Sequence, residues 1–250
     1  LWAVVLGSVG SAAGRLLMPL LSDKIGRRPT DLILFGVSLG LSAAFLHGVV
    51  TSIVGPNGCG KTTLFKILTG LITDYAGEVR IDGQAPGVYT KSIVSYLPEK
   101  TYLSDWMRAR DALAMFADFY RDFDRKKAEE LLRQFRLEPA MRLKTMSKGM
   151  QEKLQLILVM SRAAKLYILD EPLSGIDPAA RDSILDIILK NYTEDSTVLL
   201  STHLIYDVER IFDDVVMMDY GRLIAADSAD ALREKAGKSL DAYFWEVFKC

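Results

Sequence analysis

The sequence predicts an α/β fold in which short apolar strands alternate with amphipathic helices. A β-branched run at residues 49–54 is followed at once by a glycine-rich loop, and a second apolar run at residues 166–170 ends in two carboxylates. Between these runs, residues 104–136 have the apolar spacing of helices. Strands that alternate with helices along a chain are typical of a mainly parallel sheet covered by helices.

The individual elements follow from local patterns. Runs of four to eight β-branched or aromatic residues bounded by turn residues predict strands, and apolar residues spaced three and four apart predict helices. The predicted elements are a strand at 49–54, a helix at 61–69, a strand and turn at 77–84, helices at 111–120 and 125–135, a helix at 154–165, a strand at 166–172, a helix at 179–190, a strand at 196–203 and a hairpin at 214–227.

The first part of the chain has a different composition. Residues 1–21 and 32–50 are almost free of charge, and each run is about long enough to span a bilayer. They flank a polar loop, "SDKIGRRPTD". The stretch "PLLSDKIGRRP" resembles the loop between two membrane helices of major facilitator superfamily transporters. We therefore expect a transmembrane-like apolar helix-loop-helix over residues 1–47, with a pair of helices buried in protein as the alternative.

Charge and cysteine content exclude several classes of function. The net charge is −1, and no stripe of Lys and Arg interleaved with aromatic residues is present, so we expect no binding to nucleic acid. The two cysteines, Cys59 and Cys250, cannot form a disulfide framework, which favours a reducing compartment. The histidines, His47 and His203, form no cluster with metal-ligand spacing.

The loop "GPNGCGKT" has the spacing of a phosphate-binding loop. Glycines let backbone N–H groups surround phosphate oxygens, and the helix that follows adds its positive end. Lys61 is expected to reach the β- and γ-phosphates of a nucleotide, and the Thr62 hydroxyl to ligate Mg²⁺. The predicted phosphate-binding residues are Gly55, Pro56, Asn57, Gly58, Cys59, Gly60, Lys61, Thr62 and Thr63.

The run "LYILDEP" delivers two carboxylates at the end of a buried strand. Asp170 is expected to hold Mg²⁺, and Glu171 to orient and deprotonate an attacking water. Such a pair alone is more often a polar strand end, but here it follows a phosphate-binding loop. The two motifs together favour hydrolysis of a nucleotide.

Residues from about 48 to 250 resemble the nucleotide-binding domain of ATP-binding cassette (ABC) transporters. The stretch "MSKGMQEKLQL" is similar to the signature sequence of that family, and the resemblance places Ser147 and Gly149 on the ATP of an opposing subunit. By the same resemblance "SGIDP" places Asp177 at a dimer seam, and "STH" gives His203 a contact with the γ-phosphate. "VSYLPEK" matches the Q-loop, with Glu99 in place of the usual Gln as a nucleotide and metal ligand.

The resemblance implies a P-loop NTPase core over residues 48–250, with an α-helical subdomain at about 99–152 that contacts a membrane partner near Trp106 and Met107. It implies an ATP- and Mg²⁺-dependent ATPase that forms a head-to-tail dimer of cassettes with an ABC membrane-spanning subunit, at the cytoplasmic face of the cell membrane. The form of the signature and Q-loop resembles ABC-2-type exporters.

The sequence leaves alternatives to this function open. The first antiparallel strands of a cassette, with the aromatic residue that stacks on adenine, are missing from the pattern before Val49. A truncated or chimeric cassette with weak or no ATPase activity is therefore one alternative. A non-transport ABC ATPase is another, although the sequence contains neither a long coiled-coil insertion nor a second cassette. A complete facilitator-type carrier would need about ten more spanning helices.

Overall fold

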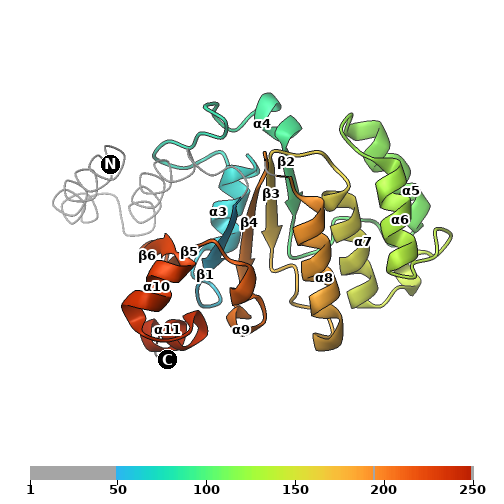
Figure 1. Ribbon diagram of the computed structural model, residues 1–250. Coiled ribbons are helices and arrows are strands. Elements are labelled where there is room, and N and C mark those ends of the chain that lie inside the picture. Colours follow the sequence, from blue (N-terminus) through green and yellow to red (C-terminus); the bar gives the residue numbers. More distant parts are fainter. Residues whose placement is uncertain (1–48, 194, 249–250) are drawn as a thin grey trace.

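Figure 1 shows the computed structural model, which describes residues 49–193 and 195–248. The predicted helix-loop-helix at 1–47 and the expectation about strands before Val49 lie outside these residues. The described elements are β1 (Val50–Val54), α3 (Lys61–Leu68), α4 (Val88–Ile93), β2 (Val94–Leu97), α5 (Ala109–Phe119), α6 (Arg125–Gln134), η1 (Leu143–Thr145), α7 (Lys148–Met160), β3 (Leu166–Asp170), α8 (Pro178–Asn191), β4 (Thr197–Thr202), α9 (Ile205–Val208), η2 (Glu209–Ile211), β5 (Asp214–Asp219), β6 (Arg222–Ser228), α10 (Ala229–Ala236) and α11 (Leu240–Val247).

The strands of the described residues form one six-stranded sheet in the order β2-β3-β4-β1-β5-β6. The neighbouring pairs β2–β3, β3–β4, β4–β1 and β1–β5 are parallel. Strand β6 runs antiparallel to β5 and forms the second arm of the predicted hairpin. β1 lies in the interior of the sheet, with Val50 opposite Val198 of β4 and Thr51 opposite Asp214 of β5. The predicted α/β fold is confirmed.

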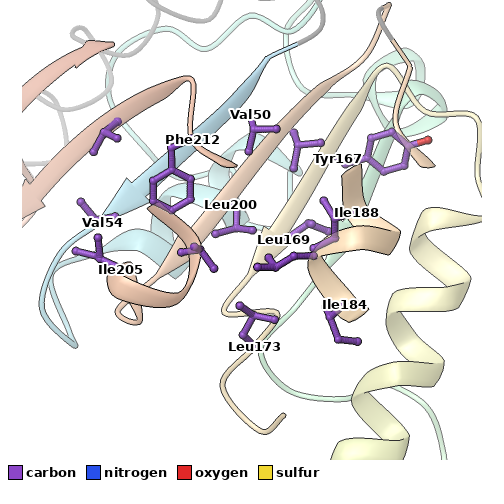
Figure 2. Packing of buried hydrophobic residues seen from close by; sticks show 14 of the residues in the cluster. Val50, Val54, Tyr167, Leu169, Leu173, Ile184, Ile188, Leu200, Ile205 and Phe212 are labelled. Atoms are coloured by element: carbon purple, nitrogen blue, oxygen red, sulfur yellow. The ribbon is translucent and has the colours of Figure 1, made fainter. Parts of the chain in front are cut away.

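Helices cover both faces of the sheet, as continuous apolar strands require. On one face, Val50 and Val54 of β1 and Leu169 of β3 pack with residues of α7, α8 and the C-terminal helices, as Figure 2 shows for Ile184 and Ile188 of α8. On the other face, the alternate residues of the same strands pack against α3. All five residues of β1 are buried, so β1 is held from both sides.

A separate apolar cluster lies beyond α7, where α5 and α6 pack against it (Figure 1). Leu113 and Phe116 of α5, and Leu131 and Leu132 of α6, meet Leu154, Ile157 and Leu158 of α7. Helix α7 is therefore buried between this cluster and the sheet, whereas its first turn stays more open. Among the helices in the described ranges, none combines the length and the apolar character needed to cross a bilayer.

The structure corrects two local predictions. Residues 77–84 do not form a strand; Ile81 and Gln84 form an isolated bridge, although Val79 and Ile81 are buried. Burial alone does not make a strand, because a strand needs a neighbour with which to exchange backbone hydrogen bonds. Trp106 and Met107 fall within the predicted helical stretch at 104–136 but outside the observed helix, since α5 begins at Ala109. Met107 is buried, and Trp106 is exposed.

Candidate nucleotide-binding site

The glycine-rich loop connects the end of β1 to the start of α3. Gly58 and Gly60 have φ angles of 81° and 110°, in the left-handed region that glycine adopts without steric cost. Gly55 is needed for space instead, because a Cβ there would lie 2.3 Å from the carbonyl oxygen of Met218. The loop is pinned from outside by Gly221, whose N–H donates to the Cys59 carbonyl at 2.7 Å.

Lys61, the first residue of α3, turns back over this loop. Its Nζ donates to the carbonyl oxygens of Gly55 at 2.7 Å and Pro56 at 3.3 Å. The same ammonium lies 3.8 Å from Oε1 of Glu171, and its residue is 6% exposed. A buried ammonium with few anionic contacts favours the binding of an anion at the mouth of the loop.

Asp170 ends β3 beside Ser201, which is near the end of the neighbouring strand β4. The Ser201 hydroxyl donates to Oδ1 of Asp170 at 2.6 Å. Oδ2 of Asp170 is buried and has no hydrogen-bond partner among the described residues. Buried carboxylate oxygens are normally satisfied, so this oxygen has capacity for a further ligand such as a cation or a water.

Glu171 follows directly and has a φ of 51°, which is unfavourable for a residue with a Cβ. Its N–H donates to the Ser201 hydroxyl at 3.0 Å. Oε2 of Glu171 lies 2.8 Å from Nδ1 of His203, while Oε1 faces Lys61. The carboxylate is thus held between a cation and an imidazole, and the strained backbone directs it there.

These groups surround a pocket of about 310 Å³. Its lining of polar residues and glycines suits phosphate groups, and the described lining residues include no Phe, Tyr or Trp. The pocket is lined by Asn57, Gly58, Gly60, Lys61, Thr62, Thr63, Glu99, Glu171, Ser174 and His203.

The remaining predicted residues lie near the pocket or away from it. Gly55, Pro56 and Cys59 belong to the loop but do not line the pocket, and burial raises the pKa of the Cys59 thiol despite the nearby Lys61. Asp170, which immediately precedes Glu171 in the sequence, is 1% exposed. The lining of the pocket does not include Ser147, Gly149 or Asp177.

Two serines of the site carry no recognised role in the sequence pattern. Ser174 lines the pocket, and its N–H donates to the Glu171 carbonyl at 3.1 Å. Ser201 links Asp170 to Glu171 and is completely buried. The polar residue at the end of an otherwise apolar strand, "TVLLST", is the one signal that could have identified Ser201.

The residues present fit Mg²⁺ better than a metal held by protein alone. No group of three or more His, Cys, Asp or Glu that could hold a metal occurs in the part of the chain that the structure describes. Mg²⁺ is usually bound through one or two carboxylates together with waters and substrate phosphates. Thr62 and Glu99 in the pocket wall and the unpaired Oδ2 of Asp170 match that arrangement.

Comparison with known proteins identifies the family. A family model described as ABC transporter matches residues 39–174. The chain belongs to the ABC transporter family. A solved structure described as the ATP-binding subunit of an ABC transporter has a TM-score of 0.71 and 30% sequence identity, and the match covers 80% of this chain and 88% of that one. The described residues therefore form an ABC ATP-binding domain with the P-loop fold, and the predicted family is confirmed.

Curated relatives in the ABC transporter family match similar shares of the chain. An uncharacterized ABC transporter ATP-binding protein of Nostoc sp. is 31% identical over 77% of this chain and 60% of its own length. A Nod factor export ATP-binding protein of Rhizobium sp. is 29% identical over 78% of this chain and 67% of its own length. The chain thus spans about three fifths of the length of the first of these relatives.

Proposed function

We propose that this chain binds ATP with Mg²⁺ and hydrolyses the terminal phosphate, as the ATP-binding subunit of an ABC exporter. The observation that carries the proposal is the position of Glu171, whose two carboxylate oxygens face Lys61 at 3.8 Å and His203 at 2.8 Å in the wall of the pocket. This arrangement supports a role for Glu171 as a base between a phosphate-binding cation and a second polar group.

Each residue has a role that its contacts support. The backbone N–H groups of the loop and the Lys61 ammonium bind the phosphates, with Lys61 exchanging its carbonyl contacts for phosphate oxygens. Glu171 accepts a proton from a water as the water oxygen forms a bond to the γ-phosphorus. The bond from that phosphorus to the bridging oxygen breaks, and ADP keeps the electron pair. His203 holds Glu171 in position and contacts the γ-phosphate.

Mg²⁺ would be held by Thr62, Asp170 and Glu99 together with phosphate oxygens. When bound, it supplies positive charge to the β- and γ-phosphate oxygens. Ser201 orients Asp170 for this purpose, because it fixes Oδ1 and leaves Oδ2 for a ligand.

A second cassette completes the site in this proposal. Ser147 is exposed, and it caps α7 by accepting from the Met150 N–H at 3.3 Å. Ser147 and Gly149 are absent from the pocket lining of their own chain, which suits a role at the pocket of another. The first turn of a helix favours an anion. We infer a head-to-tail dimer in which this turn meets the γ-phosphate of the opposing cassette and Asp177 lies at the seam.

A second groove offers a surface for the membrane-spanning subunit. It has a volume of about 660 Å³ and lies between residues of α3, β2 and α5. Its lining is mainly apolar, and Leu71 and Phe119 on it are 62% and 78% exposed. Exposed apolar patches of this kind mark interaction sites. A membrane subunit bound here would place the cassette at the cytoplasmic face of the membrane, with residues 99–152 as the subdomain that transmits motion.

Export, rather than import, is supported by the relative whose name includes Nod factor export. The cargo is set by the membrane subunit in this proposal, and the cassette supplies the motion. ATP closes the two cassettes on each other, and hydrolysis lets them open.

Hydrolysis of ATP by the purified full chain tests the proposal. We expect saturable Mg²⁺-ATP binding that is lost in Lys61→Ala. Glu171→Gln should keep binding while kcat falls about 10²- to 10⁴-fold, the usual contribution of a general base. Lys126→Ala, an exposed cation on α6, is the matched control for loss of a positive charge. A folded chain that binds no Mg²⁺-ATP would refute the proposal and favour a cassette without nucleotide function.

A further inference from the structure

The loop that follows Glu171 packs against the first turn of α7 at two glycines. A Cβ at Gly149 would lie 3.3 Å from the Gly175 carbonyl oxygen, so the two backbones are close to contact there. A Cβ at Gly175 would lie 2.1 Å from Oε1 and 2.3 Å from Oε2 of Glu152. The carboxylate of Glu152 therefore lies flat against the α-carbon of Gly175.

Glu152 is placed there at an energetic cost. Its side chain is 16% exposed, and Oε2 is buried with no hydrogen-bond partner among the described residues. Oε1 has Lys148 Nζ at 3.6 Å, but the Lys148 side chain is 76% exposed and contributes little. Burial raises the pKa of the Glu152 carboxyl, which Lys148 opposes. An apolar residue of similar size would avoid this cost, so packing alone does not account for a carboxylate at this position.

The same loop reaches the nucleotide pocket one residue earlier. Ser174 lines the pocket and donates its N–H to the Glu171 carbonyl at 3.1 Å. On either side, Leu173 and Ile176 are anchored in the core with 1% and 4% exposure. A displacement of Ser174 by a bound nucleotide would therefore be passed to Gly175, because the loop is held at both ends.

We propose that Glu152 is a positioning residue, which rests against Gly175 and fixes the first turn of α7 relative to the loop that lines the nucleotide pocket. The inference rests on the proposed function, in which Ser147 and Gly149 of that turn serve the pocket of a second cassette. Through Glu152, the nucleotide bound in one pocket sets the orientation of the residues that complete the other pocket.

Gly175 allows a direct test because it is required for space and not for backbone conformation. Its φ lies outside the left-handed region, so alanine fits the backbone there. The added methyl group would meet the Glu152 carboxylate and force it away. Gly175→Ala therefore removes the contact without touching a group that binds nucleotide.

The experiment is a double-mutant cycle on the full chain with Glu152→Ala, Gly175→Ala and the double variant. We expect each single variant to lower kcat about tenfold or more, since a misplacement of about 1 Å costs on the order of 100-fold. ATP affinity should stay within about twofold, and the double variant should be no worse than Glu152→Ala, because contacting residues are not additive. Glu152→Gln, which keeps the planar group, should retain kcat. Additive losses, or wild-type kcat in Gly175→Ala, would overturn the proposal.

Hydrogen exchange of the nucleotide-free variants separates this inference from the proposed function. We expect faster amide exchange in peptides covering residues 146–153 and 172–178 in Glu152→Ala and Gly175→Ala, and unchanged exchange in Glu152→Gln. A chain that shows this pattern but no ATP hydrolysis would contradict the proposed function and leave the positioning contact in place. Unchanged exchange in both single variants would show that Glu152 positions neither segment.

Discussion

The hydroxyl of Ser201 donates a 2.6 Å hydrogen bond to Oδ1 of Asp170. The same hydroxyl accepts from the Glu171 N–H at 3.0 Å, so one side chain on β4 sets the geometry of two acidic residues at the end of β3. All three groups lie where parallel neighbouring strands end, which is the usual place for a site in this class of fold.

Replacement of Ser201 by alanine should therefore weaken the metal site. We expect Ser201→Ala to raise the Mg²⁺ concentration that gives half-maximal ATP hydrolysis by about 10- to 100-fold, the usual effect of losing a group that orients a metal ligand. A titration of ATPase rate against Mg²⁺ measures it. Ser92→Ala, in which an exposed serine is lost, is the control and should keep the wild-type curve. An unchanged Mg²⁺ midpoint in Ser201→Ala would contradict the assigned role of Asp170.

The φ of 51° at Glu171 predicts stored backbone strain. Glu171→Gly and Glu171→Ala both remove the carboxylate and should both abolish hydrolysis. The glycine variant should be the more stable by about 1 kcal/mol, because alanine in the left-handed region costs about 1 to 2 kcal/mol. Denaturant unfolding of the matched pair measures the difference. Equal free energies of unfolding would show that this backbone is unstrained.

The raised pKa of Glu152 predicts a pH-dependent effect of Glu152→Gln on stability. A carboxyl whose pKa is higher in the folded than in the unfolded state stabilises the fold below the unfolded-state pKa, and loses that contribution as pH rises through the folded-state pKa. Glu152→Gln should therefore match the wild type in Tm near pH 4 and exceed it at neutral pH. Melting curves between these values measure the difference, and a constant offset at every pH would argue against burial as its cause.

Arg162 connects the α5–α6 turn to the start of β2. It pairs with Asp122 at 3.1 Å, donates to the Val94 carbonyl at 2.7 Å and lies 3.9 Å from the Tyr120 ring. Arg162→Met should lower the free energy of unfolding by about 3 to 5 kcal/mol, because buried polar partners lose their donor. Arg133→Met, an exposed arginine on α6, should change it by about 0.5 kcal/mol or less. Chemical denaturation compares the two, and similar losses would show that the Arg162 contacts contribute little.

The polar lining of the pocket predicts weak selection among nucleotide bases. The described lining residues include no Phe, Tyr or Trp ring, so phosphate and metal contacts are expected to dominate binding. We expect GTP to compete with ATP with an affinity within about threefold, since base stacking on an aromatic ring is worth about 1 to 3 kcal/mol where it exists. Competition binding measures this. Strong preference for ATP would contradict this prediction and would require a base-binding group beyond the lining of this pocket.

Local spacing was sufficient to predict several of the residues that line the pocket. Each of these residues belongs to a short motif that can be recognised from local sequence alone. The structure brings four of them to one pocket: Lys61, Thr62, Glu171 and His203. The roles assigned to them stay predictions. The sheet was also predictable in type, because β-branched runs separated by helical spacing leave few other arrangements.

What the sequence could not show depends on contacts between distant segments. The carboxylate of Glu152 faces Gly175, and Ser201 meets Asp170, across separations that no local pattern encodes. Residues 77–84 were misassigned for the same reason, since a β-branched run does not supply its own pairing strand. Trp106 and Met107 were placed in a helix because apolar spacing does not mark where a helix begins.

The interior position of β1 has a consequence for the order in which the protein assembles. The Val50 N–H donates to Asp213, which is 163 residues further along the chain. At the usual rates of synthesis, a ribosome needs roughly 10 to 30 s to cover that distance. For most of this time β1 is complete but lacks both of its neighbouring strands, although α3 soon becomes available to cover one of its faces. The nucleotide site, which needs the residues after β4, is thus finished late, so ATP cannot help the nascent chain to fold, whereas a chaperone that shields β1 could.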